Sequence, residues 1–136
     1  MDTDPHERAG VQRRRRAQGP RSEQLRTALV ALDPGLAEWV DSFVFGEVWG
    51  RDGLSEPERI LVAVSALAAM GRSDQLRAYL FGALHAGVPA VKLHEALVMQ
   101  SVYAGFPAAI GALAVWRDVV ASARRQGLEV ELPDGL

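Results

Sequence analysis

The stretch SEPERILVAVSALAAM, residues 55–70, predicts a buried helix at the centre of the fold. Ser55 and Glu58 have the S-x-x-E spacing of a capping box, in which two side chains satisfy free N–H groups at a helix start. Few polar residues interrupt the apolar run over 60–70, so we expect this helix to be buried on nearly every side. Gly71 is a typical residue just past a helix end.

Further helix signals lie on both sides of this stretch. Asp33 followed by Pro34 is a favoured N-cap and first-turn pair, and Ser73 suits the N-cap of the helix after Gly71. The predicted helices cover about 23–31, 33–45, 55–70, 73–86, 89–103 and 107–126. No stretch long enough for a strand alternates apolar and polar residues, although 128–132 is apolar enough for a short edge strand. We predict an all-α, single-domain bundle of about six helices over residues 22–127.

The composition limits the kinds of protein that this chain can be. Its 136 residues are 49% hydrophobic, which suits one domain with a substantial core. The absence of cysteine excludes disulfides, thiolate zinc sites and thiol redox chemistry. The net charge of −2 argues against general nucleic-acid binding. No secretory signal and no uninterrupted apolar run of membrane-spanning length is apparent, so we expect a cytoplasmic protein without membrane contact.

The charge is unevenly distributed along the chain. Residues 1–26 contain seven arginines and four acidic residues, a net charge of +3, whereas the remaining residues carry −5. We interpret 1–21 as a basic N-terminal arm that is solvated or pairs with the acidic body of a neighbouring subunit. Binding of a polyanion such as nucleic acid is the less favoured alternative. Residues 128–136 are acidic, and we expect them to form a loose tail.

The segment over 46–54 is the first candidate for binding chemistry, and we expect it to be a loop. It places Glu47, Trp49 and Arg51 between glycines, which permit unusual backbone geometry. An arginine offers two parallel N–H groups to a carboxylate, so the loop suits an anionic ligand. The alternative is an ordinary loop with Trp49 in the core. Arg59 follows near a helix start, where its charge opposes the helix dipole, and it either faces solvent or binds a carboxylate of the protein or of a ligand.

Tyr79 and Tyr103 are the candidate phenols, and histidine is scarce. Each tyrosine is either a core residue with a satisfied hydroxyl or a catalytic acid. His85 and His94 are nine residues apart across a Gly-Val-Pro break, and neither belongs to a zincin-type histidine pair. We therefore expect no metal site.

Three stretches resemble the 4-carboxymuconolactone decarboxylases. EVWGRDGL (47–54) is similar to that family's D-I-W-x-R-P-G-L loop, and Arg59 falls on its arginine at the next helix start. LRAYLFGALHAGV (76–88) resembles L-x-L-H-x-x-A-A-x-N-x-G-V, and LVMQSVYAGFPAA (97–109) resembles L-M-Q-x-x-x-Y-x-G-x-P-A-A. The resemblance implies the all-helical alkylhydroperoxidase-D-like fold and assembly as homotrimers or homohexamers, with sites near subunit contacts.

Two departures from the family pattern bear on activity. The peroxidase branch of the superfamily uses C-x-x-C-x-x-x-H, and the matching stretch 72–79 contains no cysteine, which excludes thiol peroxidase chemistry. The decarboxylases keep a histidine where this chain has Tyr79, and His85 stands where they usually have asparagine. Six helical residues turn by about 240°, so His85 does not simply replace that histidine within one helix.

The resemblance implies an enzyme without a cofactor, because the substrate itself accepts the electrons released with CO₂. The matched residues suggest the following roles: Arg51 or Arg59 anchors a carboxylate, Tyr79 or Tyr103 donates a hydrogen bond to an enolate, Glu47 or His85 moves the proton, and Trp49 and Gln100 contact the substrate. We expect a diverged enzyme acting on a small anionic or polyketide-like, enolisable molecule by decarboxylation or a related proton transfer such as cyclisation or isomerisation. The alternative is a catalytically silent helical oligomer that binds a ligand or a partner protein.

Overall fold

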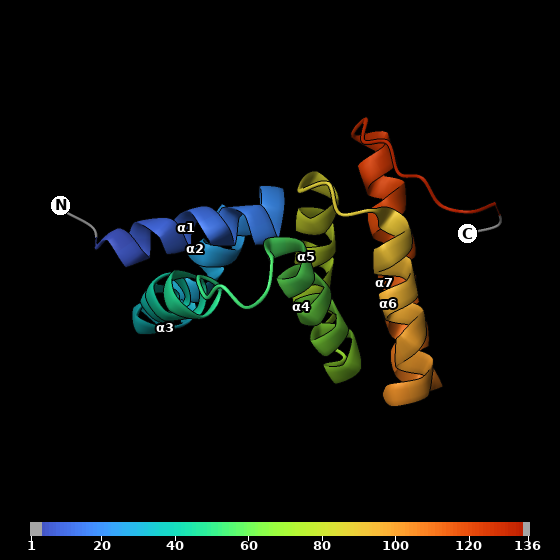
Figure 1. The fold of residues 1–136 in the computed structure, drawn as a ribbon, viewed down its shortest axis with the longest axis horizontal. Coiled ribbons are helices and arrows are strands. Elements are labelled where there is room, and N and C mark those ends of the chain that lie inside the picture. The colour runs from blue at the N-terminus through green and yellow to red at the C-terminus, as the bar shows by residue number, and fades with distance from the viewer. Residues whose placement is uncertain (1–3, 135–136) are drawn as a thin grey trace.

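The computed structural model describes residues 4–134, and within this range the fold is all-α, as predicted. The elements in chain order are α1 (Pro5–Gln18), the 3-10 turn η1 (Gly19–Arg21), α2 (Ser22–Leu32), α3 (Pro34–Trp39), the π-helix η2 (Val40–Val48), α4 (Glu56–Met70), α5 (Ser73–His85), α6 (Ala90–Tyr103) and α7 (Phe106–Arg125). Figure 1 shows α4 and α5 in the middle, with α6 and α7 on one side and α1, α2 and α3 on the other.

The helix predicted from residues 55–70 is α4. Ser55 Oγ accepts a hydrogen bond from the Glu58 N–H at 3.3 Å, and the Glu58 carboxylate accepts one from the Ser55 N–H at 2.8 Å, which completes the capping box. Gly71 ends the helix at φ +70°. The expectation of burial on nearly every side was wrong. Val62 and Met70 are exposed, because α5, α6 and α7 cover only one face of α4.

The main core lies among α4, α5, α6 and α7. Its fully buried large side chains come from all four helices: Ile60, Val64, Leu76, Leu80, Leu93, Leu97 and Val119. The Trp116 indole N–H donates to His94 Nδ1 at 3.2 Å, so this histidine is a hydrogen-bonded residue at the edge of the core. Among the described residues, α7 is the one helix long and apolar enough to cross a membrane by length and composition; its apolar residues here also supply part of the core.

The segment after α7 packs against this core instead of forming a loose tail. Val130 is buried, Leu128 and Leu132 contact the core, and the Arg124 guanidinium donates to the Val130 carbonyl oxygen at 2.8 Å. None of the residues from 4 to 134 forms a strand, so 128–132 is not an edge strand. Apolar side chains at alternate positions and the hydrogen bond from Arg124 keep the segment against the core.

The expected N-terminal arm is largely a helix, α1, that packs against η2 and α5 of its own chain (Figure 1). Glycines allow the close approach: a Cβ on Gly10 would collide with the Asp41 carbonyl oxygen, and one on Gly82 would collide with the Ala17 carbonyl oxygen. The expectation of a solvated arm was wrong for α1. Small residues make this contact, and they leave little apolar periodicity in the sequence.

The segment α3–η2 buries a different face from the one that its large apolar residues indicate. Trp39 and Phe43 are mostly exposed, whereas Ala37, Asp41 and Phe45 are buried. Helix also continues to Val48, two residues beyond the predicted loop start at 46. This face is buried because α1 packs against it, where the small residues of the α3–η2 segment let the backbone of α1 come close.

Candidate functional site

A cavity of about 310 Å³ lies among α1, α2, α3, η2 and the first half of α5. Its walls are mostly apolar and comprise Leu25, Ala28, Leu29, Leu32, Ala37, Val40, Val44 and Phe45. Its polar lining comprises Arg14, Gln18, Arg26, Asp41, Gln75 and Tyr79. A mostly apolar pocket with a few polar groups is the usual form of a small-molecule site.

Tyr79, one of the predicted catalytic residues, lines this cavity. Its ring centroid is 6.5 Å from that of Trp49, which in turn lies 5.0 Å from that of Phe45, so aromatic packing fixes the phenol in place. Burial raises the pKa of the Tyr79 hydroxyl, and an interaction with the Gln18 side chain partly offsets this rise. The hydroxyl is therefore protonated at neutral pH and able to donate a hydrogen bond.

Gln18 and Asp41 are buried polar residues of the same cavity. Gln18 Oε1 has no hydrogen-bond partner among the described residues. Asp41 Oδ1 accepts a hydrogen bond from Arg14 Nε at 2.5 Å, and Asp41 Oδ2 lies 3.1 Å from Arg26 Nη1, an ion pair without hydrogen-bond geometry. One carboxylate thus faces two guanidinium groups.

The arginine run of α1 is paired within the chain. Arg13 donates to the carbonyl oxygens of Phe45 and Gly46, at the end of η2 where helix carbonyls lack partners. Arg14 is buried and also donates to Ser22. The next two arginines bind carboxylates: Arg15 pairs with Glu23 and Arg16 with Glu56, each at 3.0 Å. These contacts all lie within one chain, and pairing of the run with a neighbouring subunit stays a prediction.

The predicted anion-binding arginines form a second, more open hollow of about 520 Å³. Arg51, Asp52, Gly53, Leu54 and Arg59 line it. Arg59 Nη2 donates to the Arg51 carbonyl oxygen at 2.7 Å, and Arg59 Nε is buried without a hydrogen-bond partner among residues 4–134. The two hollows share no lining residue, although Trp49 is close to Arg51 in sequence and contacts Tyr79.

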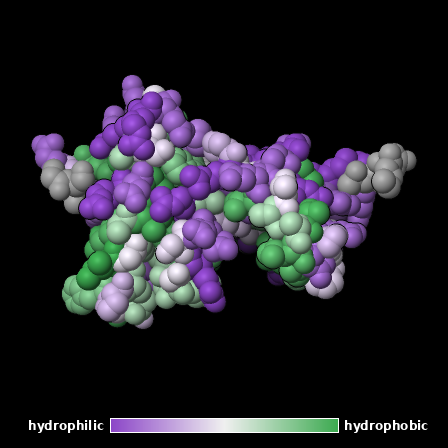
Figure 2. All heavy atoms as spheres, turned by 180° about the vertical axis from the view of Figure 1, so that it is seen from behind, coloured by the Kyte–Doolittle hydropathy of each residue, from purple (hydrophilic) through white to green (hydrophobic). Residues whose placement is uncertain are grey.

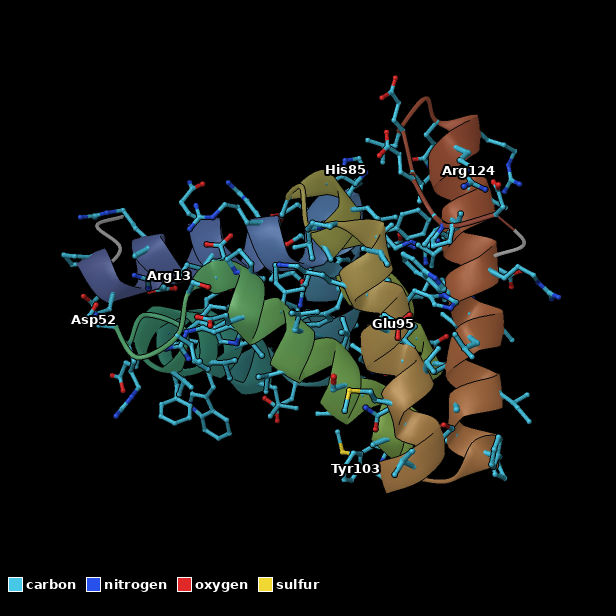
Figure 3. All side chains as sticks on the ribbon, turned by 45° about the vertical axis from the view of Figure 1, so that its right-hand side comes forward. Arg13, Asp52, His85, Glu95, Tyr103 and Arg124 are labelled. Carbon is cyan, nitrogen blue, oxygen red and sulfur yellow. The ribbon has the colours of Figure 1, made fainter. Side chains whose placement is uncertain are left out.

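The remaining predicted site residues lie away from both hollows. Glu47 is exposed on η2, and Gln100 is buried on α6, where its side chain donates to the Ala96 carbonyl oxygen at 3.1 Å. Figure 3 places His85 and Tyr103 at opposite ends of the helical body, and both are exposed. Within one chain, these four residues therefore do not share a pocket with Tyr79, and their roles stay predictions.

Arg14, Gln18, Arg26 and Asp41 are the cavity residues that sequence reasoning missed. Asp41 carried one usable signal, because it lies four residues from both Ala37 and Phe45 and so shares their helix face. A carboxylate at such a position requires a cationic partner. Arg26 carried no comparable signal, since its pairing depends on how α2 folds back over η2.

Comparison with known proteins bears on the family. Residues 34–118 match the Carboxymuconolactone decarboxylase family. The 4-carboxymuconolactone decarboxylase of Acinetobacter baylyi is 38% identical over 81 residues, which cover 60% of each chain. The nitrosuccinic acid decarboxylase of Metarhizium robertsii is 29% identical over 96 residues, which cover 71% of this chain and 66% of that protein. The matched stretches thus span less than two thirds of either relative. The chain belongs to the carboxymuconolactone decarboxylase family.

Proposed function

We propose that this chain is a cofactor-independent enzyme that removes CO₂ from a small carboxylate, and that it has diverged from the parent family reaction. The observation that carries the proposal is the Tyr79 phenol, held protonated in a mostly apolar cavity that also contains guanidinium groups. Both similar proteins are named as decarboxylases, which supports this reaction class. A cytoplasmic location is part of the same proposal.

The proposed reaction needs only binding groups and one proton. The bond between the substrate carbon and its leaving carboxylate breaks, CO₂ departs, and the electron pair moves into a substrate carbonyl to form an enolate. Tyr79 donates a hydrogen bond to the enolate oxygen, where the charge develops. A proton that comes ultimately from water then replaces the carboxylate on carbon. Cyclisation and isomerisation of an enolisable substrate would use the same enolate stabilisation.

Replacement of the family's histidine by Tyr79 is the reason to propose divergence. A histidine exchanges its proton near neutral pH, whereas a buried phenol stays protonated, so Tyr79 favours stabilising an enolate over shuttling protons. Carbon protonation then needs another route. His85 and Glu47 stay the proposed proton carriers, supplied by a second subunit.

Turnover of defined acids by variants of Tyr79 tests the proposal. The assay measures CO₂ release from 4-carboxymuconolactone, nitrosuccinic acid and a panel of β-keto acids. We expect the wild type to release CO₂ from an enolisable acid, with 4-carboxymuconolactone a poor substrate. Tyr79→Phe should lower kcat by roughly 10²–10³-fold, as loss of a donor at a developing oxyanion does. Tyr79→His should raise activity on 4-carboxymuconolactone.

The same assay separates the alternatives. Full activity of Tyr79→Phe would remove Tyr79 from the mechanism, and loss in Tyr103→Phe instead would assign the role to the other phenol. Rapid turnover of 4-carboxymuconolactone by the wild type would contradict divergence. Saturable binding of acids without CO₂ release from any of them would favour a catalytically silent binding protein. Arg51→Ala and Arg59→Ala test whether the loop hollow anchors the substrate.

We also propose that the chain self-associates through the adjoining ends of α6 and α7. Figure 2 shows apolar surface gathered at that end of the molecule. Large apolar side chains are exposed there: Met99, Val102, Tyr103, Phe106 and Ile110. No charged residue occurs between Glu95 and Arg117, so the part of this surface formed by the ends of α6 and α7 carries no charge that a second copy would bury. The homotrimer or homohexamer implied by the family resemblance supplies the expected stoichiometry.

Light scattering coupled to size-exclusion chromatography tests this self-association. We expect a trimer or hexamer for the wild type and smaller species for the double variant Val102→Glu with Phe106→Glu. Ala121→Glu, on the exposed side of α7, is the matched control and should leave the mass unchanged. A monomeric wild type, or a double variant of unchanged mass, would contradict the proposal.

A further inference from the structure

Arg26 is the unsatisfied cation of the cavity. Its Nη1 is buried and faces Asp41 Oδ2 at 3.1 Å, whereas no hydrogen bond from its Nε or Nη2 is found within residues 4–134, and its side chain is 35% exposed. Arg14 uses Nε and Nη1 on Asp41 and Ser22 and is buried. Arg26 is therefore the guanidinium of this pair with N–H groups free to bind an incoming molecule.

The charge of this cluster is not balanced inside the cavity. Arg14 and Arg26 contribute two positive charges, and Asp41 contributes one negative charge. Glu23 lies 3.5 Å from Arg14 but is 61% exposed, and its other partner is the exposed Arg15, so it belongs to the solvent side. One positive charge is left facing the cavity. A mostly apolar site with one excess positive charge favours a ligand that places one carboxylate beside that charge.

Gln18 gives an independent indication of a ligand. Its side chain is buried in the cavity lining, and its Oε1 lacks a hydrogen-bond donor among the described residues. An orphaned buried amide oxygen is costly unless a water or a ligand supplies a donor. The remaining walls, from α2 and η2, offer apolar contact for a ring or a short chain.

We propose that Arg26 binds a carboxylate group of a small amphipathic acid, whose apolar body lies against Leu29 and Val44. Arg14 and Asp41 act as positioning residues, because Asp41 holds the Arg26 guanidinium at the cavity and Arg14 holds Asp41. Arg14 lies on α1 and Arg26 on α2, so both guanidinium groups come from the N-terminal helices, before the stretch 34–118 that matches the family model.

The assignment says which carboxylate Arg26 binds, and this step rests on the proposed function. A cation fixed beside a leaving carboxylate stabilises the electron pair that must move away as CO₂ forms, and so opposes the reaction. The carboxylate on Arg26 is therefore one that the reaction leaves in place. The leaving group then lies away from Arg26, in the rest of the cavity that Tyr79 also lines.

Calorimetric titration of the full chain with 3-phenylpropionate and with its neutral amide tests this site. We expect the acid to bind about tenfold or more tightly than the amide. Arg26→Met should abolish that preference and Arg26→Lys should restore part of it. Leu29→Trp, which fills the cavity while leaving the charged cluster intact, should prevent binding of both compounds. Arg117→Met, on the exposed side of α7, is the matched control and should bind as the wild type does.

Several results would overturn the assignment. Equal binding of acid and amide would do so, as would an acid preference that survives Arg26→Met. Loss of binding in Arg51→Met but not in Arg26→Met would place the site at the other hollow. No binding at millimolar concentration would also contradict the assignment. Leu29→Trp gives a separate readout if the Arg26 variants unfold. Acid binding at Arg26 without CO₂ release from any substrate would contradict the proposed function alone. Unaltered turnover by Arg26→Met would contradict this site alone.

Discussion

Replacing Asp41 by asparagine should cost more stability than any exposed charge change in this chain. Its side chain is 1% exposed and faces the guanidinium groups of Arg14 and Arg26. Asparagine keeps the size of the side chain but leaves Arg26 without a counter-charge and Arg14 with only the exposed Glu23, 3.5 Å away. Removing one member of a buried ion pair costs about 3–5 kcal/mol, because the remaining charge stays desolvated. That is a large part of the ~5–15 kcal/mol that stabilises a typical domain.

The expected change in melting temperature follows from the length of the chain. With about 2.1 cal/mol/K of unfolding entropy per residue, 136 residues give roughly 0.3 kcal/mol/K. A loss of 3–5 kcal/mol then lowers Tm by about 10–17 °C. Urea and thermal unfolding of Asp41→Asn, followed by circular dichroism, measure both quantities. Asp118→Asn is the matched control, since its 3.9 Å pair with Arg117 is exposed, and its effect should stay within about 0.5 kcal/mol.

A double-mutant cycle tests the stated cause. Arg14→Met removes the other member of the pair, and the double variant should be less destabilised than the two single effects added together, by about 1–3 kcal/mol. A cost for Asp41→Asn below about 1 kcal/mol, at an unchanged urea m-value, would refute the reasoning. Strict additivity of the two changes would show that Asp41 and Arg14 act independently.

Three smaller perturbations test individual contacts of the fold. Gly82→Ala should destabilise the protein by about 1–3 kcal/mol in urea unfolding, because the added Cβ meets the Ala17 carbonyl oxygen. The matched variant Gly111→Ala places its Cβ in open space and should stabilise the protein by up to about 1 kcal/mol. Equal effects of the two changes would contradict the close contact at Gly82. Ser55→Ala should cost about 1 kcal/mol through loss of the N-cap, and a change below about 0.3 kcal/mol would contradict it. Hydrogen bonds from Ser55 lower the pKa of Glu58, so its stabilising effect is present above the unfolded pKa and is lost on acidification below about pH 4.3; Glu58→Gln should flatten this part of the Tm-against-pH curve.

The helices with strong local signals were predictable from sequence. The capping box at Ser55 and Glu58, the glycine at 71 and the proline after Asp33 act over three or four residues, and each lies where predicted. The helix α1 was not predictable in the same way. Its buried face consists of Gly10, Arg14, Ala17 and Gln18, which give no apolar stripe. Its packing depends on partners that are distant in sequence.

The candidate site was also predictable only where local sequence signals mark it. Tyr79 was identified because a resemblance pointed to its position and its helix was well marked. The residues that give the cavity its charge were missed, because Arg14 is 27 residues from Asp41 in sequence and no local pattern couples them. The large apolar residues of the α3–η2 segment also indicated the wrong buried face, since Trp39 and Phe43 are mostly exposed and the Asp41 carboxylate lies on the buried face.

The N-terminal helices change what the family position at Tyr79 can do. The cavity that α1 and α2 help to line partly buries the phenol, which raises its pKa and strengthens its hydrogen bond to any developing negative charge. The same helices contribute both guanidinium groups to the cavity lining. The cavity combines a permanent positive charge with the neutral hydrogen-bond donor Tyr79. This pair suits a reaction in which one substrate carboxylate stays bound while the charge of another moves onto an enolate oxygen. The segment first interpreted as a basic arm supplies Arg14, and the next helix supplies Arg26, so the two N-terminal helices together provide the electrostatics on which the proposed divergence depends.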